Sequence, residues 1–135
     1  MAVANHIIPL TGLVCAGTSL AAKQYYFVAL NSSGTVEVCA SGDPGMLGVL
    51  LNKPTAGQAC EIAAVGSICP VSADAALSVG NVLRCSADGQ AAAGIDGSYT
   101  CGMVMEAAAG ANNIVRAQIW FPNSVADVSL YSTCA

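Results

Sequence analysis

Short apolar runs alternate with turn-forming clusters along the whole chain, and this alternation restricts what the chain can fold into. The runs are rich in Val, Ile, Leu and Tyr, and clusters of Gly, Asn, Asp and Ser separate them. No stretch keeps apolar residues at i, i+3, i+4 and i+7 over three turns, as an amphipathic helix requires. The pattern therefore predicts an all-β fold. We expect strands near residues 5–9, 12–15, 25–30, 35–39, 46–52, 59–64, 67–70, 81–85, 90–93, 100–106 and 114–121.

Two parts of the sequence correspond to each other about 55 residues apart. Residues 28–34 match residues 83–89, and residues 47–65 match residues 101–119, where each copy has a glycine within a strand and then an Ala-Gly turn. Two copies are too few for a solenoid. They predict a small barrel or a sandwich of two similar halves, about 25–66 and 80–121, whose glycines mark bends or close backbone approaches. A chance echo in a chain rich in Gly and Ala is the alternative.

Charge is scarce in this chain. Only 9% of the 135 residues are charged, whereas 55% are hydrophobic, and a typical domain has about 25% charged residues. We therefore expect another molecule to cover part of the surface. The four cations are dispersed and the net charge is -4, which argues against a nucleic-acid partner. No run of about 20 apolar residues is present to span a membrane.

The seven cysteines show no spacing typical of a metal site. There is no C-x-x-C, and a single histidine cannot complete the usual zinc ligand sets. Most of the cysteines alternate with Val, Leu or Ile, which predicts that they are small buried apolar residues. Cys134 lies outside any strand pattern and is the candidate for an interchain disulfide.

The sequence contains no catalytic motif that we can identify. His6, the only histidine, lies in a predicted arm, and no nucleophile elbow, P-loop or H-E-x-x-H motif occurs. Glu106 is placed to pair with Arg116 on the following strand of a hairpin, whereas Glu37 and Glu61 fall at strand positions that face water. We expect a protein that is not an enzyme and uses neither a cofactor nor a metal.

The two ends of the chain are predicted to lie outside the β domain. Residues 1–20 form an N-terminal arm, residues 21–121 form the β domain, and residues 122–135 form a C-terminal tail, because Pro122 ends the last strand. A signal peptide of about 22 residues is the alternative for the N-terminal segment. It lacks a cationic start, however, and Pro9 and Gly12 interrupt its apolar part.

Two patterns of glycine and alanine run through residues 25–120. In the first, Gly-Val and then Ala-Gly lead through Gly-Ser-Ile-Cys-Pro-Val at 66–71 to Val-Gly-Asn at 79–81. In the second, Glu-Ala-Ala-Ala-Gly at 106–110 leads to Ile-Val-Arg at 114–116. On these patterns the sequence resembles the small capsid decoration (cement) proteins of tailed bacteriophages. The cysteines, the arm and the tail depart from the family pattern.

The resemblance implies a compact β-barrel or β-tulip-like domain, often a homotrimer, on the outer surface of the virion's head. It implies that the protein binds the outer face of the mature head and stabilises contacts between subunits of the major capsid protein. Arm residues are then expected to add to a capsid strand: His6, Ile7, Ile8 and Leu10. Other apolar residues are expected in a contact between copies: Trp120, Phe121, Leu130 and Tyr131.

Two other functions remain open from the sequence. The chain is alternatively a secreted or surface-displayed bacterial β module, such as a pilus or adhesin subunit, in which intrachain disulfides explain the cysteines. A small-ligand barrel is a weaker alternative, because only 5% of the residues are aromatic and a lined pocket needs more.

Overall fold

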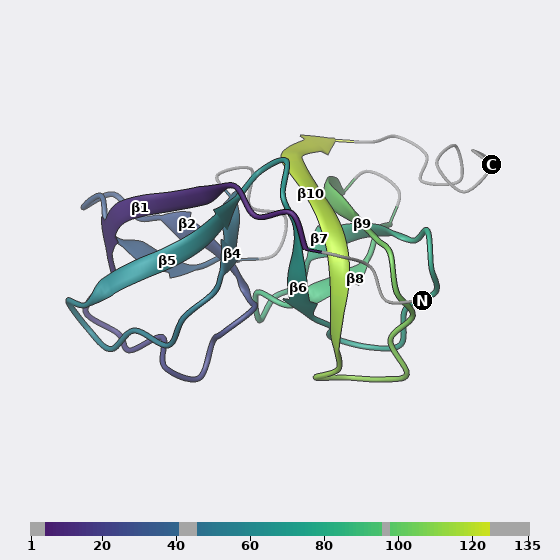
Figure 1. The fold of residues 1–135 in the computed structure, drawn as a ribbon, viewed down its shortest axis with the longest axis horizontal. Coiled ribbons are helices and arrows are strands. Elements are labelled where there is room, and N and C mark those ends of the chain that lie inside the picture. Colours follow the sequence, from purple (N-terminus) through teal and green to yellow (C-terminus); the bar gives the residue numbers. More distant parts are fainter. Residues whose placement is uncertain (1–4, 41–45, 96–97, 125–135) are drawn as a thin grey trace.

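A computed structural model describes residues 5–40, 46–95 and 98–124, with side chains as far as residue 120. These residues form ten β-strands and no helix. The strands make two five-stranded antiparallel sheets, which lie side by side along the long axis of the molecule (Figure 1). The predicted all-β class is confirmed.

The first sheet contains the first half of the chain, in the strand order β1-β5-β4-β2-β3. Its strands are β1 (Pro9–Val14), β2 (Phe27–Leu30), β3 (Val36–Val38), β4 (Met46–Leu50) and β5 (Ala59–Ala64). The second sheet contains the other half, in the order β6-β10-β9-β7-β8. Its strands are β6 (Ile68–Ser72), β7 (Val82–Cys85), β8 (Ala91–Ala93), β9 (Tyr99–Val104) and β10 (Ile114–Ser124).

The two sheets have the same topology, because each strand of the first half corresponds to the strand five places later in the second half. The register agrees as well: Val28 pairs with Gly48 as Leu83 pairs with Gly102. The repeated unit therefore starts with β1 and β6. It is longer than the halves predicted from the sequence, and β1 lies in the segment that was predicted to be an arm.

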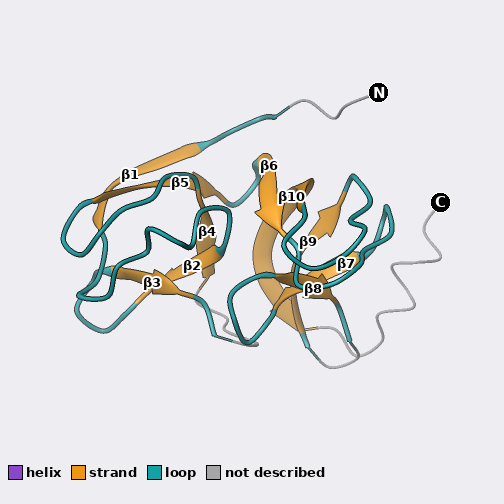
Figure 2. Cartoon of the chain, turned by 90° about the horizontal axis from the view of Figure 1, so that it is seen from below, coloured by secondary structure: helices purple, strands orange, loops and turns teal. Residues whose placement is uncertain are grey.

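Each sheet bends until the end of its first strand meets its third strand. Cys15, directly after β1, forms a parallel bridge with Val36, and Ala73, directly after β6, forms one with Ala91. These are single bridges, so neither sheet is closed by a continuous ladder. The two curved sheets give a sandwich-like domain (Figure 2).

The β2–β3 turn and the β7–β8 turn contain corresponding hydrogen bonds. Gly34, with φ 77°, donates its N–H to the Asn31 carbonyl at 3.0 Å, and Gly89, with φ 86°, donates to Ser86 at 3.0 Å. The side chains of Asn31 and Ser86 then accept further N–H groups of their turns. A left-handed φ favours glycine, which explains why the sequence echo ends on Gly in both copies.

The buried apolar side chains form two clusters. The smaller cluster fills the curved first sheet and includes Val28, Leu50 and Ile62. The larger cluster contains the corresponding residues of the second half, and it also contains Phe27 and Val49 from the first half. The other face of β2 and β4 is therefore packed against the second half, and one core joins the two sheets.

Candidate functional site

The N-terminal segment, residues 5–8, runs from β1 across to the second sheet (Figure 1). His6 and Ile68 of β6 exchange two backbone hydrogen bonds, each 2.8 Å long. The Ile8 N–H donates to the Ser67 hydroxyl at 2.9 Å, and the Ile8 carbonyl accepts from Ala64 at 2.8 Å. These main-chain groups of His6 and Ile8 are thus used within the chain.

Residues that were predicted to contact a capsid differ in their exposure. The side chains of Ile7 and Ile8 are 36% and 42% exposed. Leu10 is half-buried and pairs with Ile62 inside the first sheet. The structure therefore leaves two neighbouring isoleucines at the surface where the N-terminal segment crosses from one sheet to the other.

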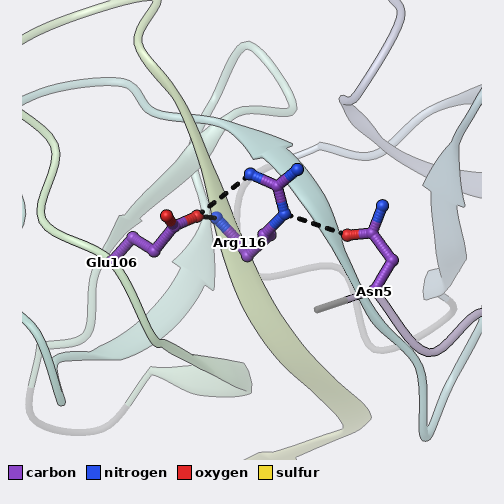
Figure 3. Close-up of polar contacts among 3 residues, drawn as sticks. All are labelled: Asn5, Glu106 and Arg116. Carbon is purple, nitrogen blue, oxygen red and sulfur yellow. Dashed lines mark hydrogen bonds and ion pairs between the residues drawn. The ribbon is translucent and has the colours of Figure 1, made fainter. Parts of the chain in front are cut away.

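Arg116 holds the start of this segment in place (Figure 3). Its Nε donates to Oδ1 of Asn5 at 3.1 Å, and its Nη1 lies 3.3 Å from Oε1 of Glu106. The same Glu106 oxygen accepts the Arg116 backbone N–H at 2.9 Å. The ion pair predicted from the sequence is confirmed. Both of its side chains are about one-third exposed, so the pair contributes less than about 1 kcal/mol and mainly orients Asn5.

The second predicted group, the subunit contact, is described only in part. Trp120 is half-buried, and its indole N–H donates to the Thr100 carbonyl at 3.2 Å. Phe121 continues β10, but its side chain lies outside the description. Leu130, Tyr131 and Cys134 lie outside the described residues, so the contact and the interchain disulfide stay predictions.

The described residues contain no obvious chemical centre. No group of three or more His, Cys, Asp or Glu side chains among them is arranged to hold a metal ion. In the same part of the chain, no helix is long and apolar enough to cross a membrane. Glu37 and Glu61 are exposed, as the strand pattern predicted.

Six cysteines lie in the described residues, and all of them are buried. Burial raises the pKa of the Cys69 thiol to about 12. Burial also raises the pKa of Cys101 and Cys60, with a smaller contribution from a neighbouring cysteine in each case. The prediction that most cysteines are small apolar core residues is confirmed for these six, and the intrachain disulfides expected of a secreted module are not formed among them.

We expect the protein to lose stability between pH 9 and pH 12. The unfolded Cys69 thiol ionises near its ordinary pKa of 9.0, whereas the folded thiol keeps its proton to about pH 12. The free energy of unfolding is therefore highest below pH 9 and falls as the pH rises, by about 1.4 kcal/mol per pH unit for one such thiol. Urea unfolding at pH 8 and pH 10.5 measures this slope. Cys69→Ala should show a shallower slope, and an equal slope would contradict the assignment.

Three exposed apolar residues of the second half lie outside the predicted strands. They are Val79, Ile95 and Tyr99, which are 66%, 57% and 38% exposed. Tyr99 begins β9, whereas Val79 and Ile95 lie in loops, so the strand pattern gives no signal for their exposure. A comparison of the two halves could have found them, because the corresponding residues of the first half are Gln24, Ala40 and Gly45.

Neither a protein-family model nor a curated protein matches this sequence. A search of solved structures finds the crystal structure of the head fiber gp8.5 N base in bacteriophage phi29. The two structures agree with a TM-score of 0.66 at 17% sequence identity, over 86% of this chain and 98% of that chain. At this identity the match shows a shared fold. Membership of the decoration-protein family stays a prediction.

Proposed function

We propose that this protein is a non-catalytic structural component of a bacteriophage head, which binds the major capsid protein on the outer face of the mature head. The observation that carries the proposal is the shared fold with the head fiber base, which extends over nearly the whole of that chain. The sequence resemblance to capsid decoration proteins, which rests on the glycine and alanine patterns, supports the same class of phage head protein. The low charge of the chain, 9%, is consistent with a surface that is covered in the virion.

Binding to the mature head would stabilise contacts between neighbouring capsid subunits. A protein that binds only the assembled, expanded lattice shifts the equilibrium away from disassembly, and many bound copies multiply the effect. The exposed isoleucines of the N-terminal segment are the contact that we assign to the capsid. Here the segment presents apolar side chains, while its paired main chain keeps it fixed to β5 and β6.

Attachment is tested by cosedimentation of the purified protein with expanded, undecorated heads. We expect binding, and we expect decorated heads to release their DNA at a higher temperature than bare heads. Failure of the wild-type protein to bind would overturn the proposal.

Ile8→Asn tests the assigned contact. We expect it to weaken attachment by about 10-fold, because one exposed isoleucine that becomes buried in an interface contributes on the order of 1–2 kcal/mol. The matched control is Ile114→Asn, since Ile114 is 48% exposed and Ile8 is 42% exposed. Ile114 begins β10, outside the assigned contact, so its variant should bind as the wild type does. Equal binding by both variants would contradict the role of the N-terminal segment but leave attachment itself intact.

A further inference from the structure

Both arginines of the chain lie on the outer face of the second sheet, which is the face turned away from the buried core. In β7, Arg84 alternates with Leu83 and Cys85, and these two belong to the larger buried cluster. Successive side chains of a strand point to opposite faces. In β10, Arg116 and Gln118 alternate with buried residues of the same cluster in the same way.

The strand register makes this outer face continuous. Val82 pairs with Met103, and Met103 pairs with Gln118. On its other side Gln118 pairs with Ile68, which pairs with His6 of the N-terminal segment. Directly paired residues of antiparallel strands lie on one face, so these five residues form one row, which we call the outer row. Val82 is buried, whereas Gln118 and His6 are exposed, so the row is accessible toward the contact that we assign to the capsid.

The same face of the first half is covered, and there its residues are small and apolar. Ala29 and Ala63 are buried against the second half. Their counterparts Arg84 and Gln118 are partly and fully exposed. A partner that covers Arg84 and Gln118 has to offer hydrogen bonds, because burying a guanidinium or an amide without them is costly. The outer row and Arg84 therefore suit a polar partner.

Charge is distributed differently on the strands of the two sheets. Within the described residues, the strands of the first sheet carry Glu37 and Glu61, whereas the strands of the second carry Arg84 and Arg116. The net charge of the chain is -4, so the face with both arginines is where an anionic partner is attracted. The described acidic residues of the second half lie in loops and turns: Asp74, Asp88 and Glu106.

Arg84, rather than Arg116, has groups available for a partner. Arg116 uses Nη1 for Glu106 and Nε for Asn5 (Figure 3). Arg84 donates its Nε–H to the Ala93 carbonyl at 3.1 Å, and within the described part of the chain its two amino groups make no further hydrogen bond or ion pair. The Nε bond orients the guanidinium, whose planar shape matches the two oxygens of a carboxylate.

The spacing of these groups indicates a large partner. Strand β9 lies between β7 and β10, so Arg84 and Gln118 are at least about 10 Å apart. A single small anion cannot contact both. Ile114 lies four residues before Gln118 in β10, about 13 Å away along the strand and outside the outer row.

We propose that the outer row and Arg84 dock on the major capsid protein beside the N-terminal segment, and that an acidic side chain of the capsid surface binds Arg84. This inference rests on the proposed function and adds the chemistry of the partner surface. The outer row ends at His6, two residues before the exposed Ile8. The polar groups and the exposed isoleucines thus form one continuous contact.

Cosedimentation with expanded, undecorated heads tests the proposal. Arg84→Gln removes the charge and should weaken attachment by about 10-fold at low salt. Arg84→Glu places a carboxylate against the capsid carboxylate and should weaken attachment by about 100-fold or more. Lys53→Gln is the matched control, because Lys53 is exposed in a loop of the first half and its loss changes the net charge equally. Its variant should bind as the wild type does.

The salt dependence gives a measurement that does not depend on how the variants fold. Added salt should weaken attachment of the wild type, and it should weaken attachment of Arg84→Gln less. Failure of the wild type to bind heads would overturn the proposed function itself. Wild-type binding that is insensitive to salt, or equal binding by both Arg84 variants and the wild type, would overturn only this inference. Retention of the wild type but not of Arg84→Gln on immobilised polygalacturonate, with equal binding of both to heads, would assign the face to an anionic polysaccharide and would also overturn it.

Discussion

Gly48→Ala is expected to lower the free energy of unfolding by about 3 kcal/mol or more. Gly48 lies in the middle of β4, where β5 passes so close that an added Cβ would overlap the carbonyl oxygen of Ala63. The obstacle is backbone on a neighbouring central strand, so no side-chain rotation can relieve it. Either the ladder between β4 and β5 separates locally or the sheet shifts, and both break main-chain hydrogen bonds next to the core.

Gly102→Ala is expected to destabilise for the same reason. Gly102 is the counterpart of Gly48 in β9, and its added Cβ would lie 2.5 Å from the carbonyl oxygen of Gln118 on β10. The control is Gly17→Ala, because Gly17 is exposed, has nothing within 4 Å of an added Cβ and has no left-handed φ. Its effect should stay within about 0.5 kcal/mol. Chemical unfolding followed by circular dichroism measures all three, and equal midpoints for Gly48→Ala and Gly17→Ala would refute the close approach.

These two glycines show how much a sequence repeat can reveal. Both halves place a glycine inside a strand, and a glycine there already indicates a bend or a close approach of the backbone. The period of the apolar runs likewise predicts most of the strands, because one face of each is buried. The repeat and the alternation are local signals, and the structure confirms both.

The packing of one half on the other cannot be predicted from the residues of a single strand. Ala29 and Ala63 face the second half and are buried, whereas their counterparts Arg84 and Gln118 are partly or fully exposed. The alternation of residues along each strand is compatible with either a covered or a solvent-exposed outer face. Only the difference between the two copies, small and apolar in the first and polar in the second, indicates which copy is covered.

The candidate contact surfaces were predictable in composition but not in position. Ile7 and Ile8 are conspicuous in the sequence, but the partner of this segment, β6, lies about 60 residues later. Pairing over such a separation is a non-local contact, so the residues near Ile7 and Ile8 in the sequence do not indicate it. For the same reason β1 could not be distinguished from a free arm.

Phe27→Ala is expected to lower the free energy of unfolding by about 4 kcal/mol. Phe27 is among the largest fully buried side chains, and it belongs to the cluster that contains residues of both halves. Its loss leaves a cavity at the junction of the two sheets, so the second half should unfold at the lower denaturant concentration together with the first. Trp120, the only tryptophan, reports on the second half through its fluorescence.

The control is Val82→Ala, at the corresponding position of the second half. Val82 is buried as well, but it does not belong to the cluster that contains residues of both halves, and removing two methyl groups costs about 2 kcal/mol. If Phe27→Ala shifts circular dichroism but leaves the Trp120 transition in place, the halves unfold independently. If one core spans both sheets, circular dichroism and Trp120 fluorescence should instead shift together. Unfolding of the first half then exposes the core of the second half to water.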